Sequence, residues 1–258
     1  MTTDFGCRDP FVGIMKGVIL GINPFVHIVD ITHDISPQNI LEASLATEMS
    51  FDSFPRGTIH IAVVDPGVGS LRRPILVVTS AYFFVGPDNG VFSRIYALHE
   101  TKTVIHITAE HYFMQQRSST FHGRDVFAPA AAWLSRGINI SNFGNPVTDY
   151  VTLDIPAPTV LSKTALEGEI ISIDRFGNAM TNMTIQHLNN FYGNYIENPE
   201  ILYRGNKVPF KHYYSEAEDK RLYSLINSFG YLELFVYKGN ASTDFDMQVG
   251  DKVSVLIN

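Results

Sequence analysis

The sequence has little cysteine, no excess of positive charge and no long apolar run. Cys7 is the only cysteine among 258 residues, which excludes an internal disulfide framework. No positively charged start precedes an apolar run, and no apolar stretch approaches the roughly 20 residues that span a bilayer. Asp and Glu number 26 against 19 Lys and Arg, a net charge of −7, which argues against nucleic acid or membrane as partner. We therefore expect a cytoplasmic protein with a small-molecule ligand.

The motifs of several common enzyme classes are also missing. Gly67-Val68-Gly69 follows an apolar run, but the third glycine of a dinucleotide fingerprint would fall at position 72, which is Arg72. The sequence has no Gly-Lys-Ser/Thr phosphate loop and no Gly-x-Ser-x-Gly nucleophile elbow. The histidines form no His-x-x-x-His pair. We therefore expect chemistry that uses neither a metal ion nor a cofactor.

The first half of the chain alternates helical and strand patterns. Asp9-Pro10 predicts a helix start with Asp9 as its cap, and apolar residues then recur at helical spacing to Ile22. Further helices are expected from Ser36 to about Phe54, shortly after Gly90, and from Arg124 to Ser135. Strands are predicted at residues 26–32, 59–64, 75–79, 82–85 and 104–108. This alternation predicts a layered α/β domain over residues 1–155.

The second half has mostly strand patterns. Residues 154–158, with two prolines, are typical of a linker. Short strands separated by Gly, Asn and Asp turns are predicted at residues 166–173, 201–203, 207–211, 232–237 and 252–257. Such a series predicts a small β-barrel or sandwich, which we assign to residues 165–258.

Four polar segments follow predicted strands in the first domain, where ligands of open α/β sheets bind. Each one alone is typical of a turn or a helix start, but together they favour a binding site. They are residues 2–6, 64–69, 85–90 and 119–125. In the second domain, residues 173–182 form the densest polar and aromatic cluster.

Taken in order, these segments resemble the S-adenosylmethionine (SAM) hydroxide adenosyltransferases, relatives of the fluorinase and chlorinase that make 5′-halo-adenosines. The resemblance extends from residue 2 to about residue 242. The matching stretches are Thr3-Asp4-Phe5-Gly6, Met15-Lys16-Gly17, Asp30-Ile31-Thr32-His33, Val64-Asp65-Pro66-Gly67-Val68-Gly69, Val85-Gly86-Pro87-Asp88-Asn89-Gly90, Thr120-Phe121-His122-Gly123-Arg124-Asp125, Asp174-Arg175-Phe176-Gly177-Asn178, Thr181-Asn182 and Asn227-Ser228-Phe229-Gly230.

The resemblance implies an N-terminal α/β domain followed by a C-terminal β-barrel, assembled as a homotrimer. It implies active sites between the N-terminal domain of one subunit and the C-terminal domain of a neighbour. The implied reaction is the hydrolysis of SAM to adenosine and L-methionine, with SAM as substrate and no cofactor. The implied catalytic residues are Asp65, Arg72 and His122, with Arg72 stabilising hydroxide and either Asp65 or His122 accepting the proton of water.

The resemblance also implies a set of substrate-binding residues. Asp4 matches the carboxylate that accepts hydrogen bonds from the ribose hydroxyls, and Asp174 matches one that meets the methionine ammonium. Aromatic residues are expected along the adenine and methionine faces, and the backbone of Asn240 and Ala241 at the adenine edge. The full set is Asp4, Phe5, Gly123, Asp174, Phe176, Asn178, Tyr214, Ser228, Phe229, Asn240 and Ala241.

Two other functions remain open from the sequence. A halogenase that forms 5′-chloroadenosine is one, although the fluorinase has Tyr and Ser at the positions that match His122 and Gly123 and has a longer loop that is absent here. Gly123 matches a glycine of the chlorinase, so this position alone does not separate the two. The other alternative is a trimeric adenosine- or SAM-binding protein with little turnover.

Overall fold

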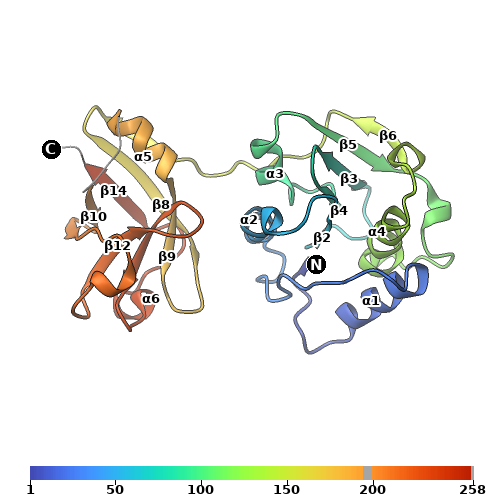
Figure 1. The fold of residues 1–258 in the computed structure, drawn as a ribbon, viewed down its shortest axis with the longest axis horizontal. Helices are drawn as coiled ribbons and strands as arrows, with labels where there is room; N and C mark the ends of the chain where they lie inside the picture. Colours follow the sequence, from blue (N-terminus) through green and yellow to red (C-terminus); the bar gives the residue numbers. More distant parts are fainter. Residues whose placement is uncertain (194–198, 257–258) are drawn as a thin grey trace. The chain divides into compact units, whose positions relative to one another are not determined.

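The computed structural model describes residues 1–193 and 199–256, which form two compact units, Met1–Ile155 and Pro156–Asn258 (Figure 1). The first is an α/β unit and the second consists mainly of antiparallel strands. Residues 151–158, which include the predicted linker, contain no helix or strand. Within the described ranges, no helix has the length and apolar character needed to cross a membrane.

A mixed six-stranded sheet forms the centre of the first unit. Its order is β1-β2-β4-β3-β5-β6, with β1–β2 and β2–β4 parallel and the other pairs antiparallel. The strands are β1 (Thr2–Thr3), β2 (Ile59–Val63), β3 (Pro74–Thr79), β4 (Phe83–Pro87), β5 (Lys102–Ile107) and β6 (Gly144–Val147).

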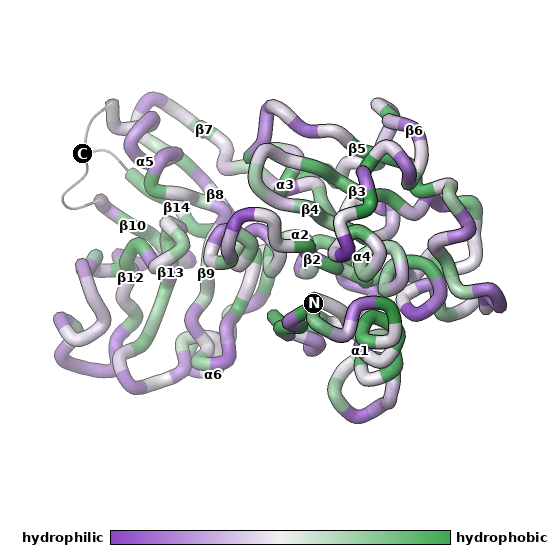
Figure 2. The backbone as a smooth tube through the Cα atoms, turned by 45° about the vertical axis from the view of Figure 1, so that its right-hand side comes forward, coloured by the Kyte–Doolittle hydropathy of each residue, from purple (hydrophilic) through white to green (hydrophobic). Residues whose placement is uncertain are grey.

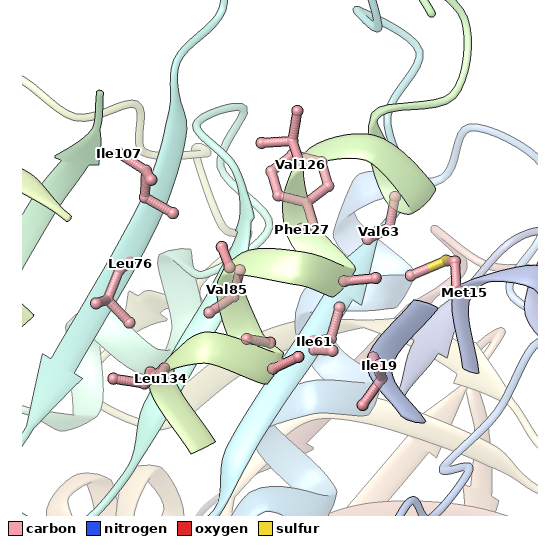
Figure 3. Packing of buried hydrophobic residues seen from close by; sticks show 14 of the residues in the cluster. Met15, Ile19, Ile61, Val63, Leu76, Val85, Ile107, Val126, Phe127 and Leu134 are labelled. Carbon is pink, nitrogen blue, oxygen red and sulfur yellow. The ribbon is translucent and has the colours of Figure 1, made fainter. Parts of the chain in front are cut away.

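Helices cover both faces of this sheet because alternate strand residues are apolar on both sides. On one face, α1 (Phe11–Ile22) and α4 (Ala128–Ser135) pack on side chains such as Ile61 and Leu76 (Figure 3). On the other face, α2 (Ile40–Ser50) and α3 (Ser93–Leu98) pack on neighbours such as Ala62 and Val77. The layered α/β prediction is confirmed.

Several predicted elements differ in the details. Residues 26–32 form no strand, because their neighbour β1 is two residues long and the pairing is a single bridge between Thr2 and Thr32. Asp9 does not cap α1, which begins at Phe11 without a side-chain cap. The second helix begins at Ile40 rather than Ser36, because Asn39 caps it by accepting from the Glu42 amide. The last predicted helix opens with a π-helical turn, Gly123–Phe127.

The second unit is a nearly closed antiparallel barrel. Its strand order is β11-β10-β14-β8-β9-β13-β12, and β7 pairs additionally with β8. The Lys211 amide donates to the Ser224 carbonyl (2.7 Å), and the Ser224 amide donates to the Pro209 carbonyl (2.9 Å), which joins β12 to the segment after β11. The strands are β7 (Thr159–Ser162), β8 (Ala165–Ile173), β9 (Ala179–Thr184), β10 (Glu200–Tyr203), β11 (Asn206–Val208), β12 (Leu222–Ile226), β13 (Tyr231–Val236) and β14 (Lys252–Leu256).

The barrel interior contains alternate residues of these strands, including Leu232, Leu234 and Val236 of β13, and hydrophobic stretches run along the strands in Figure 2. The β-barrel prediction is confirmed, although β7, β9 and β12 were not predicted. The helices α5 (Ile185–Tyr192) and α6 (Ala241–Asp244) were also missed. Residue 257, at the end of the last predicted strand, lies outside the described residues.

Candidate active site

Asp65, Arg72 and His122 form one cluster in the first unit. Asp65 follows β2, Arg72 precedes β3, and His122 precedes the π-helical turn. Arg72 Nε donates to Asp65 Oδ1 (2.8 Å), its Nη2 donates to Asp65 Oδ2, and Nη2 also contacts His122 Nδ1 (2.8 Å). The side chains of Arg72 and Asp65 are only 9% and 5% exposed, and the guanidinium lies over the Phe127 ring. Arg72 is therefore a fixed, partly desolvated cation.

The tautomer of His122 follows from this contact. A guanidinium has donors and no acceptor, so Nδ1 must accept from Arg72, which assigns the proton of a neutral ring to Nε2. Burial and the adjacent Arg72 charge lower the pKa of His122, although Asp65 and Asp125 oppose the shift. His122 is therefore neutral at pH 7 and presents an N–H donor at Nε2.

Gly69 brings the two loops of this cluster together. Its φ is +79°, a region that favours glycine, and a Cβ there would collide with the Ser119 carbonyl oxygen. The close approach of Gly69 to Ser119 places the loop of Asp65 and Arg72 against the segment that leads into His122. Next to it lies a cavity of about 570 Å³, whose lining includes Arg72, His122, His106 and Arg117.

The π-helical turn after His122 is anchored by Asp125. This carboxylate is buried and accepts from the Ser118 amide (2.7 Å) and from Arg124 Nε (2.6 Å). The Met114 amide in turn donates to the Asp125 carbonyl (2.9 Å). Asp125 therefore ties residues 114–118 to the segment that carries His122, which accords with the frequent location of π-turns at functional sites.

Asp4, Phe5 and Gly123 lie in the same unit. Asp4 follows β1, and its Oδ2 accepts from the Gln38 amide (2.9 Å). The Phe5 ring lies 6.0 Å from Phe121, next to His122 in sequence. A Cβ on Gly123 would meet Met15 Sδ at 3.0 Å and the Phe5 ring at 3.4 Å, so this position has little room for a side chain.

In the second unit, Asp174 and Asn178 form one turn. Asp174 Oδ1 accepts from the amides of Phe176 (2.9 Å) and Asn178 (2.8 Å), while Oδ2 accepts from Asn178 Nδ2 (3.1 Å). Asn240 packs on Gly177 of this turn and caps α6, whose first residue, Ala241, is buried. The structure thus brings Asp174, Asn178, Asn240 and Ala241 together.

Three aromatic side chains predicted to bind substrate are unusually exposed. Phe176 is 73% exposed, Phe229 50% and Tyr214 44%. Ser228 is also exposed, in the turn between β12 and β13. Large aromatic side chains that are this exposed are typical of a ligand-binding surface.

Glu233, which contacts both Tyr214 and Asn227, was missed by sequence reasoning. The Tyr214 hydroxyl donates to Glu233 Oε1 (2.7 Å), and Asn227 Nδ2 donates to Glu233 Oε2 (3.0 Å). An acid inside the apolar run Tyr231–Val236 was the available signal, since a buried charge needs partners. Among residues 1–193 and 199–256, no three His, Cys, Asp or Glu side chains are grouped to hold a metal ion.

Comparison with known proteins identifies the family. Models of the SAM hydroxide adenosyltransferase N-terminal and C-terminal domains match residues 1–144 and 168–254. Proteins named (R)-S-adenosyl-L-methionine hydrolase from Methanocaldococcus jannaschii and Thermus thermophilus are 35% and 32% identical, over 99% and 98% of this chain and 94% and 97% of their own lengths. A fluorinase from Nocardia brasiliensis is 22% identical, over 99% of this chain and 95% of its own.

A solved structure agrees with this result. The crystal structure of an uncharacterized conserved protein from Thermotoga maritima has a TM-score of 0.92 and 31% identity, covering 99% of this chain and 98% of that one. The similarity in sequence and the similarity in structure thus both extend over the two units. The chain belongs to the SAM hydroxide adenosyltransferase family.

Proposed function

We propose that this enzyme hydrolyses SAM to adenosine and L-methionine by attack of water on the C5′ carbon. The contact of Arg72 with both Asp65 and His122 is the observation that carries the proposal. The names of the similar hydrolases point to the R epimer at the sulfonium as the substrate. We propose that neither a metal ion nor a cofactor takes part, so chelators should leave the rate unchanged.

The main requirement of this reaction is the activation of the nucleophile. The sulfonium leaves as a neutral thioether, so the leaving group needs no general acid. Water must instead be held in line with the C5′–S bond and lose a proton. The guanidinium of Arg72 stabilises hydroxide by Coulomb attraction, which is strong where bulk water is excluded. Attack by hydroxide on a cation neutralises charge, so a dry site favours the reaction.

We assign His122 the role of orienting the nucleophile through Nε2–H. Its Nδ1 is already occupied by Arg72, and a second positive charge there would repel the guanidinium. Each Asp65 oxygen accepts one bond from Arg72 and keeps a further lone pair. We therefore propose Asp65, rather than His122, as the first acceptor of the water proton.

We propose that the substrate is held by residues of both units. Asp4 accepts from the ribose hydroxyls, with Phe5 and Gly123 beside it, and Asp174 meets the methionine ammonium. The aromatic and polar residues of the barrel complete the pocket: Phe176, Asn178, Tyr214, Ser228, Phe229, Asn240 and Ala241. By family resemblance we propose a cytoplasmic homotrimer in which the two halves of each site come from neighbouring subunits.

Hydrolysis in ¹⁸O-labelled water tests the proposal. Each SAM epimer is supplied separately, and adenosine is analysed by mass spectrometry. We expect adenosine with one ¹⁸O at the 5′ position, equimolar L-methionine and a preference for the R epimer. Adenosine without label, or no adenosine from either epimer, would contradict hydrolysis. Formation of 5′-chloroadenosine in high chloride would instead support the halogenase alternative, and adenosine binding without turnover the binding-protein alternative.

A further inference from the structure

Glu233 is a buried carboxylate that the proposed mechanism does not use. It lies in β13, where Leu232 and Leu234 point into the barrel core and Glu233 lies on the opposite face with Phe235. The residue is only 5% exposed, and the side chains that donate hydrogen bonds to it, Tyr214 and Asn227, are uncharged. A carboxylate in this position has a desolvation cost, which its hydrogen bonds must offset.

One oxygen of Glu233 holds the ring of Tyr214. The phenol donates to Oε1 (2.7 Å), and the ring packs edge-on against Phe235 at 4.9 Å between centroids. Tyr214 begins a short 3-10 helix, Tyr214–Glu216, and is otherwise 44% exposed. Without the bond to Glu233, the phenol would donate its hydrogen bond to water, and the ring would lose its fixed orientation.

The other oxygen of Glu233 holds the turn of Phe229. Asn227 Nδ2 donates to Oε2 (3.0 Å), while Asn227 Oδ1 accepts from the amides of Phe229 (3.0 Å) and Tyr231 (3.1 Å). The Nδ2 and Oδ1 atoms of this amide thus both have partners, which fixes its orientation. Glu233 therefore connects two exposed aromatic residues that lie in different loops.

Tyr214 and Glu233 lie near Asp174, one of the proposed substrate-binding residues. Burial raises the pKa of Glu233, the bonds from Asn227 and Tyr214 oppose the shift, and the charge of Asp174 adds to it. Asp174 also contributes to the raised pKa of Tyr214, after burial and the bond to Glu233. Asp174, Tyr214 and Glu233 are thus close enough to interact through their charges.

We propose that Glu233 is a positioning residue that fixes Tyr214 and the Phe229 turn for binding of the adenine ring. The inference rests on the proposed function for the identity of the ligand. A preorganised aromatic surface binds a flat ring without an added ordering cost, so loss of Glu233 weakens binding. The effect is on the affinity rather than on the chemical step, because neither Glu233 nor Tyr214 meets the reacting atoms.

The test compares four variants by the Kd of adenosine, the KM and kcat for SAM, and the melting temperature. Glu233→Leu removes both acceptors and should raise Kd and KM about tenfold, with kcat within about twofold, since one well-formed hydrogen bond corresponds to roughly that factor. Glu233→Gln should rescue binding, because its oxygen accepts from Asn227 and its amide donates to the Tyr214 hydroxyl. Tyr214→Phe should raise Kd by roughly threefold.

Tyr203→Phe is the matched control. Its phenol donates to Asp251 Oδ2 at the same distance of 2.7 Å in the same unit, and this oxygen also accepts from Arg204 and from the Gln248 amide. This variant should lower the melting temperature as Tyr214→Phe does and leave Kd unchanged. Wild-type affinity for adenosine in a folded Glu233→Leu, or in Tyr214→Phe if Glu233→Leu does not fold, overturns the inference. The Kd of adenosine is measured without turnover. The result of this test therefore does not depend on whether the enzyme hydrolyses SAM, and the two proposals can fail separately.

Discussion

At the scale of single residues, the guanidinium of Arg72 has the most specific geometry in the site. Two of its nitrogens contact Asp65, and Nη2 also reaches His122, which an ammonium group cannot reproduce. We therefore expect Arg72→Lys and Arg72→Ala to lower kcat by at least about 100-fold, with the Kd of adenosine nearly unchanged.

Arg73 provides the matched control for Arg72. It is also paired, with Asp88 (2.8 Å from Nε) and Asp149, but these contacts lie outside the proposed site. Arg73→Lys should keep kcat within about threefold of the wild type. Equal losses of kcat in the Arg72 and Arg73 variants would count against a direct role of Arg72, as would unchanged turnover in Arg72→Ala.

The pH dependence should report the charge of His122. Burial and Arg72 lower the pKa of this ring below its usual value near 6.5, so the neutral form persists at neutral and alkaline pH. Protonation on acidification removes the Nδ1 acceptor and sets two positive charges together. We therefore expect kcat/KM for SAM to be constant around pH 7–8 and to fall with a midpoint below about 6.5.

His122→Asn should have a lower kcat/KM than the wild type. Its kcat/KM should not show the fall on acidification, because an amide does not titrate. A midpoint well above 6.5 would mean that the resting enzyme carries a charged His122, which would reverse the tautomer assignment. If kcat/KM of His122→Asn still falls on acidification as in the wild type, the titrating group is not His122.

At the scale of elements, the contact of Gly69 with Ser119 determines whether the Asp65–Arg72 loop meets His122. Gly69→Ala adds left-handed strain and a collision with a backbone carbonyl. We expect kcat/KM to fall at least about tenfold and stability to fall by about 1–3 kcal/mol. Gly137→Ala has the same kind of strain (φ +85°) with nothing within 4 Å, and should lose stability without losing activity.

The elements also show what the sequence could predict. The period of the apolar residues predicted α1 and the buried strands β2, β3 and β5 to within two residues at each end. β9 was missed because polar residues, Thr181 and Asn182, are buried in it, and tertiary hydrogen bonds to the Leu232 and Pro156 carbonyls satisfy them. The capping box of Thr184 and His187 and the left-handed Gly193 were readable signals for α5.

For the site, each sequence motif taken alone was typical of an ordinary turn or helix start and did not identify a function. The contact between Asp65 and Arg72 depends on a loop geometry that no periodic pattern encodes, and His122 joins them across 50 positions of sequence. The resemblance to a family supplied that grouping, whereas Glu233 emerged only from its buried hydrogen bonds.

At the scale of the whole molecule, the candidate residues divide between the two units. Asp65, Arg72 and His122 lie in Met1–Ile155, and Asp174 and Tyr214 lie in Pro156–Asn258. If each site joins units of neighbouring subunits in a ring, two inactive variants should complement each other. Asp65→Asn disables the first half of the site and Asp174→Ala the second, so a mixed trimer contains some sites with both halves intact.

The expected size of this recovery is set by random assembly. After the two variants are unfolded together and refolded at equal amounts, a site is intact only where an Asp174→Ala subunit supplies the first unit and an Asp65→Asn subunit supplies the second. This occurs in about one quarter of the sites, so turnover should reach about one quarter of the wild-type value. A chain that carries both substitutions, refolded with an equal amount of wild type, should likewise leave about one quarter of the sites intact, because both halves of a site must then come from wild-type subunits, whereas sites within one chain would leave about one half. Recovery no greater than the sum of the two variants alone would mean that each site forms within one chain.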